Sequence, residues 1–293
     1  MGWNMDTGMA AYLACLWEVT ARKPGNVTWE RDFTDTDYTD FVLGALAVAR
    51  AAEGASRWGI GRTVLEAVRC MRTWAKANTH LGTALLIAPL AAIGCESSTK
   101  SALPRLLDDL TVEDTRLVFV AIRMAMPGGL GHAPREDVFS EPTRPLKSVM
   151  ALAAERDAVA RQYVCDFADV FDSADYIECR VRDNWPLEWA IIGSYLRLLA
   201  RQPDSLVARK CGAAMARRAS DFAAQTLQAG WPDTAPGWRH YHDLDRWLRQ
   251  DGNKRNPGTT ADLVAASLFV LLKEDRIGWP PPLFWPQAAP TAD

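Results

Sequence analysis

The sequence predicts an all-α fold in which several helices surround one buried helix. Apolar residues recur at helical spacing along most of the 293 residues. No hairpin signal flanks alternating apolar residues, and no alternation of strands with helices indicates a parallel sheet. The segment 81–93 is apolar on nearly every side, as expected of a helix at the centre of a bundle.

Five helices are expected in the first half of the chain, over residues 9–20, 37–53, 63–77, 81–93 and 111–126. Apolar residues three and four apart define them. The turn Lys23-Pro24-Gly25-Asn26 ends the first helix. The sequence Thr111-Val-Glu-Asp114 resembles a capping box and therefore opens the last.

Five further helices are expected over residues 148–171, 187–200, 204–229, 239–250 and 259–273. The segment 231–238 contains tryptophans and prolines and is expected to be a loop. No change in composition marks an interdomain linker. Residues 1–279 are therefore expected to form one domain, followed by a Pro-rich, extended tail over 280–293.

Composition limits the classes of function. Lysine and arginine total 33 and aspartate and glutamate total 36, for a net charge of −3 without a basic block, so no nucleic-acid partner is expected. No apolar run is long enough for a membrane span, and the first residues lack the pattern of a signal peptide. The six cysteines have neither zinc-ligand nor C-x-x-C spacing, which indicates free thiols. A cytoplasmic protein without a membrane partner is expected, with a homodimer as one option.

The segment Asn256-Pro-Gly258-Thr259-Thr260-Ala-Asp262 opens a strongly apolar helix. Free N–H groups and the helix dipole favour anions at such a start, and a carboxylate there could hold a metal that carries phosphates. The alternative is an ordinary helix start, at which Thr259 or Thr260 is the cap and Asp262 complements the dipole.

Glu18 and the turn after it form a second candidate group. Gly25 lets the backbone turn tightly, Lys23 offers a charge to phosphate, and Glu18 could accept a proton or face a metal. The alternative is a helix end with a nearby lysine.

The third group, Asn78-Thr79-His80-Leu81-Gly82, precedes the buried helix. Asn78 is either a helix cap or a ligand contact, and His80 is either structural or catalytic. The glycines of Pro127-Gly-Gly-Leu-Gly131 either wrap a phosphate or end a helix.

An acidic helix face is predicted where Asp166, Asp169, Asp172 and Asp175 recur at three-residue spacing. Carboxylates this close need a cation. Arginines such as Arg161 or Arg180 could supply it, or the face could bind magnesium.

Together these segments resemble the triphosphoribosyl-dephospho-coenzyme A synthase family. The matching stretches are 18–27, 78–82 with Ala88-Pro-Leu90 behind it, and 256–262. The segment 127–131 with Asp137, and residues 161–163 with 167–169, match a broader branch of the family. The resemblance covers nearly the whole chain.

The resemblance implies an all-α, magnesium-dependent transferase. In this reaction the 2′-hydroxyl of dephospho-coenzyme A attacks the anomeric carbon of the ATP ribose and displaces adenine. Glu18 or His80 is then the candidate general base, and Asp262, Asp166 and Asp169 are candidate ligands of Mg²⁺. The candidate substrate- or phosphate-binding residues are Lys23, Gly25, Asn26, Asn78, Thr79, Gly82, Asn256, Gly258, Thr259 and Thr260.

Three departures from the family pattern allow other functions. The turn continues as Asn26-Val27-Thr28 in place of Leu-Val-Asp, the Gly-x-His-x-Asp-Met segment is replaced over 31–36, and Leu81 occupies a position that is basic in the family. These changes remove a histidine and a cation, which predicts weaker binding of dephospho-coenzyme A.

One alternative is therefore another nucleotide- or phosphate-dependent transferase or condensing enzyme, in the biosynthesis of a one-carbon cofactor of the methanopterin or methanofuran type. A second alternative is a non-catalytic helical protein that binds a nucleotide or a partner. The presence of Glu18, Lys23, Asn78, His80 and Asp262 argues against the second.

Overall fold

The computed structural model describes residues 5–94 and 98–278 and confirms the all-α prediction. Its described part contains fifteen helices and no strand. The helices are α1 (Thr7–Thr20), α2 (Tyr38–Ala52), α3 (Ala55–Trp58), α4 (Ile60–Trp74), α5 (Leu81–Ala92), α6 (Thr99–Asp108), α7 (Val112–Ala125), α8 (Leu146–Ala153), α9 (Ala158–Gln162), α10 (Ala168–Arg182), α11 (Leu187–Arg201), α12 (Ser205–Cys211), α13 (Ala213–Gln228), α14 (Ala235–Leu248) and α15 (Gly258–Lys273).

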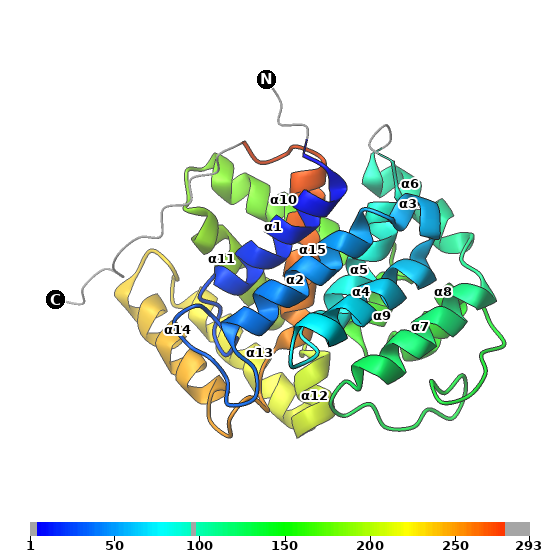
Figure 1. Ribbon diagram of the computed structural model, residues 1–293. Coiled ribbons are helices and arrows are strands. Elements are labelled where there is room, and N and C mark those ends of the chain that lie inside the picture. Colours follow the sequence, from blue (N-terminus) through cyan, green and yellow to red (C-terminus); the bar gives the residue numbers. More distant parts are fainter. Residues whose placement is uncertain (1–4, 95–97, 279–293) are drawn as a thin grey trace.

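Two apolar helices occupy the centre of the molecule (Figure 1). The predicted buried helix α5 packs against α15, whose residues Leu263–Leu272 are all buried. Because these ten residues include only one polar side chain, Ser267, α15 can be covered on every side. The hydroxyl of Ser267 donates to the Leu263 carbonyl at 2.8 Å, so this polar group is satisfied within its own helix.

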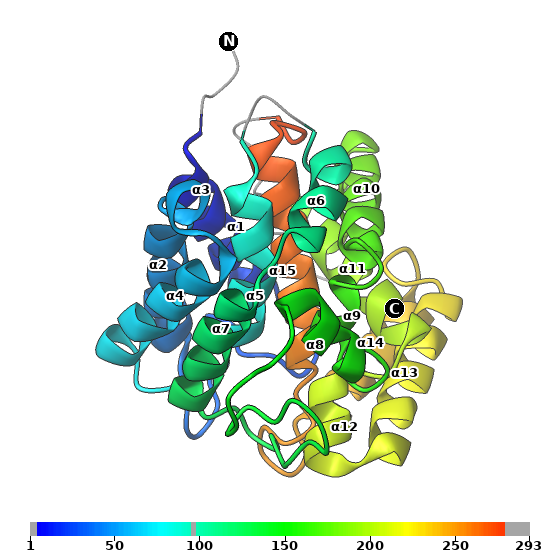
Figure 2. The same cartoon turned by 90° about the vertical axis from the view of Figure 1, so that its right-hand side faces the viewer.

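Helices cover the central pair on two sides. On one side α1 packs on α2, α2 on α4 and α4 on α7. On the other, α10 packs on α11, α11 on α13 and α13 on α14. Figure 2 shows these two groups with α5 and α15 between them. The predicted capping box is present at α7, where Asp114 N–H donates to the Thr111 hydroxyl at 3.1 Å and Thr111 N–H donates to the Asp114 carboxylate at 2.9 Å.

The prediction of one helix over 148–171 was wrong, because the chain forms α8, α9 and the start of α10 there. The Asp157 carboxylate accepts from Val159 N–H at 2.9 Å and begins α9. Asp166 and Phe167 then have φ values of 49° and 61°, and the buried Phe167 ring holds the chain at this bend. Neither glycine nor proline marks the break, so the sequence pattern did not show it.

Other boundaries also differ from the predictions. Gly212, with φ 89°, divides the expected helix 204–229 into α12 and α13. The expected loop 231–238 ends earlier, because the Thr234 hydroxyl accepts from Gly237 N–H at 3.0 Å and begins α14. The short α3 and α6 were not predicted, and the tail 280–293 and Cys95 lie outside the described residues.

The remaining five cysteines are free thiols in the structure, as expected. Within residues 5–94 and 98–278, no helix has the length and apolar character needed to cross a membrane.

Candidate active site

A cavity of about 790 Å³ opens between the two sides of the bundle. Its walls come from the end of α1, the α4–α5 connection, the α7–α8 loop, the α8–α9 junction, α12 and the start of α15. The three sequence segments that suggested a site therefore meet in space. The predicted site residues that line the cavity are Glu18, Asn26, Asn78, Thr79, His80, Gly82, Asn256, Gly258, Thr259 and Asp262.

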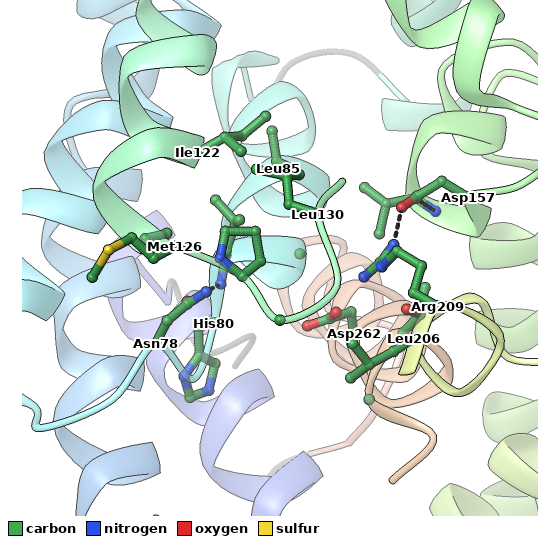
Figure 3. A pocket seen from close by; sticks show the side chains of 18 of the residues that line it. Asn78, His80, Leu85, Ile122, Met126, Leu130, Asp157, Leu206, Arg209 and Asp262 are labelled. Atoms are coloured by element: carbon green, nitrogen blue, oxygen red, sulfur yellow. Dashed lines mark hydrogen bonds and ion pairs between the residues drawn. The ribbon is translucent and has the colours of Figure 1, made fainter. Parts of the chain in front are cut away.

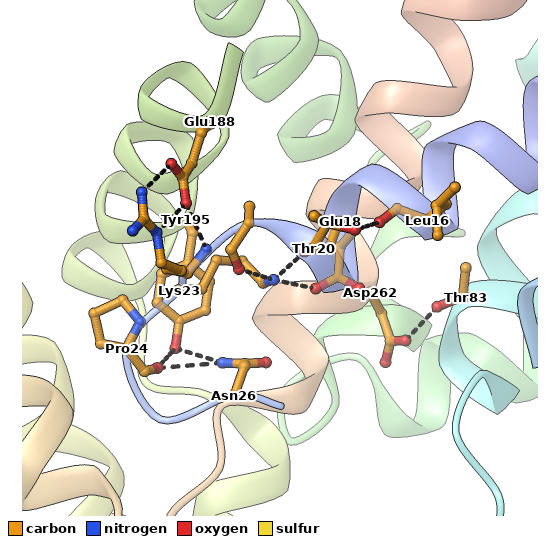
Figure 4. A network of polar contacts seen from close by, with 12 residues as sticks. Leu16, Glu18, Thr20, Lys23, Pro24, Asn26, Thr83, Glu188, Tyr195 and Asp262 are labelled. Atoms are coloured by element: carbon orange, nitrogen blue, oxygen red, sulfur yellow. Dashed lines mark hydrogen bonds and ion pairs between the residues drawn. The ribbon is translucent and has the colours of Figure 1, made fainter. Parts of the chain in front are cut away.

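Glu18 reaches the cavity from the last turns of α1 and is held by Lys23. The fully buried Lys23 ammonium lies 2.9 Å from the Glu18 carboxylate and also donates to the carbonyls of Glu18 and Ala21 (Figure 4). All three of its N–H donors therefore have acceptors in the protein. Burial raises the pKa of Glu18 above the usual range, and the neighbouring ammonium opposes that rise.

Asp262 faces the same cavity from the first turn of α15. Thr83 on α5 donates its hydroxyl to the Asp262 carboxylate at 2.6 Å. A Cβ atom at Gly82 would lie 2.1 Å from the second carboxylate oxygen, so only glycine permits this approach of α5 to α15. Burial raises the pKa of Asp262 to about 8, and the charge of Glu18 contributes to the rise.

Glu18 and Asp262 together form a pair of carboxyl groups on the cavity wall. Burial disfavours the charged form of each group. Mg²⁺ binds oxygen ligands and is commonly held by one or two carboxylates together with substrate phosphates. The Asp262 carboxylate, at a cavity that a substrate can enter, fits that ion, whereas Glu18 is already paired with the Lys23 ammonium. The described residues contain no group of three or more potential metal-binding side chains, so substrate oxygens would complete the coordination.

His80 lies at the start of α5 with its ring almost fully buried. Its Nδ1 shares a 2.7 Å hydrogen bond with the Thr79 hydroxyl, and the ring packs edge-on against Phe41. Burial lowers the pKa of His80 to about 3, so the imidazole is neutral at ordinary pH and is a weak base. Asn78, which accepts from Leu81 N–H at 3.2 Å, stabilises the helix start next to it.

Two buried polar atoms of the cavity residues have no hydrogen-bond partner in the described structure, His80 Nε2 and Asn256 Oδ1. A buried polar group without a partner costs about 1–3 kcal/mol, so polar groups of a ligand are the expected partners of these atoms. Figure 3 shows Asn78 and His80 on one side of the cavity, with Leu206, Arg209 and Asp262 on the other.

Lys23, Gly25 and Thr260 support the cavity from behind and do not line it. Gly25 has φ 76°, and its N–H donates to Asp245 at 2.8 Å, which fixes the turn against α14. Thr260 donates both its N–H and its hydroxyl to Asp204 at 2.7 Å. The structure thus gives these residues protein partners where the sequence suggested substrate contacts.

Asp166 and Asp169 also lie outside the cavity lining. Asp166 is 3.7 Å from the Lys147 ammonium, and Asp169 pairs with Arg161 at 3.1 Å. Protein cations therefore compensate this acidic face, which was the alternative considered for it. The structure does not bring these two carboxylates together with Asp262.

Sequence reasoning missed Asp204. This buried carboxylate accepts from the N–H groups of Leu206 and Val207, at 2.9 and 3.0 Å, and also from Thr260. It thereby joins the starts of α12 and α15. An aspartate directly before a helix start is an ordinary cap signal, and nothing local indicates the second helix.

Sequence reasoning also missed a group of six cations on the cavity wall, because they come from four separate segments of the chain: Arg72, Lys76, Arg135, Arg156, Arg209 and Lys210. Acidic residues are interspersed with them along the chain, so no basic run marks them. The glycine segment 127–131 lines the cavity as well, through Gly128, Leu130 and Gly131.

Comparison with known proteins matches nearly the whole chain to one family. The sequence profile of the ATP:dephospho-CoA triphosphoribosyl transferase (CitG) family matches residues 4–281. A crystal structure from Archaeoglobus fulgidus, provisionally described as triphosphoribosyl-dephospho-coA synthase, superposes with a TM-score of 0.64 at 26% sequence identity. That match covers 80% of this chain and 97% of the other. No curated protein matches the chain significantly.

Proposed function

Since this chain belongs to the ATP:dephospho-CoA triphosphoribosyl transferase family and is a transferase, we propose that it moves the triphosphoribosyl group of Mg·ATP to a dephospho-coenzyme A-type acceptor. The bond between the anomeric carbon of the ribose and adenine breaks, and its electron pair leaves with adenine. A bond forms between that carbon and the acceptor hydroxyl oxygen, and the hydroxyl proton is balanced by the proton that adenine takes up.

The observation that carries this proposal is the pair of carboxylates, Glu18 and Asp262, on the wall of one large cavity. Displacement at an anomeric carbon develops positive charge on the sugar, which nearby carboxylates stabilise. The cavity is large enough for a drug-sized or larger ligand, for which 300–1,000 Å³ is a typical range.

Glu18 is the best candidate for the general base. Its raised pKa makes it a stronger base than an ordinary surface glutamate, and Lys23 fixes the carboxylate in position. His80 is less suitable, because burial holds it neutral with a pKa of about 3. Its unpartnered Nε2 can instead orient a substrate by hydrogen bonding.

Asp262 would hold Mg²⁺ together with oxygens of the triphosphate. The ion would neutralise charge on the triphosphate and orient it. Gly82 and Thr83 fix the Asp262 side chain, so that this carboxylate keeps one direction when ligands enter.

One observation favours the alternative of a related transfer to a different acceptor. Leu81 lines the cavity, and it occupies a position that is basic in the family pattern. An apolar side chain there cannot bind an acceptor phosphate. The same cavity would then bind the nucleotide as proposed, and the transferred group would go to an acceptor of a one-carbon cofactor pathway.

The experiment that tests the proposal is incubation of the protein with Mg·ATP and dephospho-coenzyme A, followed by chromatography for free adenine and for the joined product. Acceptor-dependent adenine release supports the synthase reaction, and its loss in Glu18→Gln locates it at this site. Nucleotide binding without adenine release in the presence of dephospho-coenzyme A would favour the alternative acceptor. Absence of both adenine release and nucleotide binding would refute the proposal.

A further inference from the structure

Five of the six cations of the cavity form two groups, and Arg135 on the α7–α8 loop belongs to neither. Arg156, Arg209 and Lys210 lie at the α8–α9 junction and on α12, whereas Arg72 and Lys76 lie at the end of α4 and just after it. We propose that these groups are separate phosphate subsites, the α12 group for the triphosphate of the donor and the α4 group for the diphosphate of the acceptor. This inference rests on the proposed function, because it requires two phosphorylated substrates.

The α12 group is positioned by the loop that crosses the cavity. A Cβ atom at Gly129 would lie 3.2 Å from Arg209 Cβ, and one at Gly128 would lie 3.2 Å from Lys210 Cε. The glycine segment is therefore packed directly against both basic side chains. Arg209 pairs with Asp157, whereas Lys210 has no ion pair with any described residue.

Arg156 extends this group because it immediately precedes Asp157, the partner of Arg209. Arg156 itself makes no ion pair within residues 5–94 and 98–278. Three positive charges with one carboxylate among them leave this wall with a net positive charge, which favours a polyanion.

The α4 group is smaller. Arg72 is exposed, lines the cavity and has no ionic partner in the part of the chain that the structure describes. Lys76 lies 3.5 Å from Asp37, but its side chain is 82% exposed, so this pair holds it weakly. Two cations suit a diphosphate better than a triphosphate.

The two groups lie on different sides of the cavity. Helix α4 packs on α2, α5 and α7, whereas α12 packs on α13 and α15. Figure 3 places Asn78, which follows the α4 group in sequence, across the cavity from Arg209, with Asp262 low on the Arg209 side. Two polyphosphates in one undivided basic pocket would repel each other, so separate subsites lower the cost of binding both.

The α12 group is assigned to the donor because α12 is tied to α15. Asp204 bonds the start of α12 and the Thr260 N–H of α15, so Arg209 and Lys210 are fixed relative to Asp262. The triphosphate has to reach both these cations and the ion that Asp262 would hold. The α4 group has no such connection within the described residues, and it precedes Leu81, where the chain departs from the family pattern.

The test compares two double variants, Arg209→Gln/Lys210→Gln and Arg72→Gln/Lys76→Gln. Inorganic tripolyphosphate with Mg²⁺ is the probe of the donor subsite, and its binding to each variant is measured by calorimetry. The KM values for ATP and for dephospho-coenzyme A are measured separately, in the adenine-release assay. We expect the α12 variant to weaken tripolyphosphate binding and raise the ATP KM by about tenfold or more, because charge-assisted contacts are lost. We expect the α4 variant to raise only the acceptor KM.

Two single variants serve as controls. Arg217→Gln removes a charge from the exposed side of α13, outside the cavity, and should leave both ligands unaffected. Asp157→Asn can still cap α9 but removes the carboxylate beside Arg209, so it should bind tripolyphosphate more tightly than the wild type.

Equal weakening of both ligands by both double variants would overturn the inference, because it would show one shared basic field. Reversed effects would overturn the assignment of donor and acceptor. If the wild type releases no adenine but tripolyphosphate binding still depends only on Arg209 and Lys210, the proposed reaction fails while the α12 anion subsite stands.

Discussion

Replacing Lys23 by methionine tests whether this lysine exists to hold Glu18. The substitution keeps the length of the side chain but removes an ammonium that is fully buried and 2.9 Å from the Glu18 carboxylate. The Glu18 side chain is only 7% exposed, so water from the cavity can replace the lost partner only in part. Removing one member of a buried pair typically costs about 3–5 kcal/mol, and we expect a loss of this size in the free energy of unfolding at pH 8.

The loss should depend on pH, because Glu18 can take up a proton when its cation is gone. Burial already raises its pKa in the folded protein, and the opposing effect of Lys23 disappears in the variant. An acid whose folded-state pKa lies above the unfolded value of about 4.3 destabilises the fold increasingly as pH rises between those two values. The penalty of Lys23→Met should therefore be smaller at pH 5.5 than at pH 8, by at most about 1.4 kcal/mol per pH unit.

Urea unfolding followed by tryptophan fluorescence measures these free energies at the two pH values. The exposed Lys76→Met is the matched control and should change stability by no more than about 0.5 kcal/mol. Addition of Glu18→Gln to Lys23→Met should remove the pH dependence and restore part of the stability. A loss below about 1 kcal/mol, or an identical loss with and without Glu18→Gln, would refute the buried-pair explanation.

Three further outcomes are expected. Gly82→Ala places a Cβ 2.1 Å from an Asp262 oxygen, so it should lower the free energy of unfolding by about 1–3 kcal/mol. It should also reduce kcat about a hundredfold, because it displaces that carboxylate; an unaltered kcat would contradict this. Asp262→Asn should retain the fold yet weaken Mg·ATP binding in calorimetry. In metal-free buffer the wild type should lose stability as pH rises from about 4 towards the Asp262 pKa of about 8, and the neutral amide should abolish that loss; a variant with the wild-type pH dependence would contradict this. Reductant should leave the melting temperature unchanged, because the five described cysteines are free thiols; a marked fall would indicate a bridge.

Local sequence was sufficient for most of the longer helices, because an apolar pattern or a capping signal within the segment itself marks them. The apolar run of α5 and the capping box of α7 are examples, and both were predicted close to their observed limits. Boundaries failed where a tertiary contact ends a helix without glycine or proline. At Phe167 the burial of an aromatic ring outweighs the helical preference of the surrounding residues, and this depends on neighbours that are distant in the chain.

The candidate residues of the site were largely visible in the sequence, because Glu18, His80 and Asp262 each lie in a polar segment at a helix end. What each residue does was decided by tertiary packing. Lys23 points inward to Glu18, and Thr260 is bonded to Asp204. Burial keeps His80 neutral and makes it a poorer candidate base than the carboxylates. The partners of Thr83 and Asp204 lie 179 and 56 residues away, and the cations of the cavity come from several helices. Sequence patterns report spacing along one helix, whereas charge compensation and burial depend on which helices meet, so only the folded structure could fix these roles.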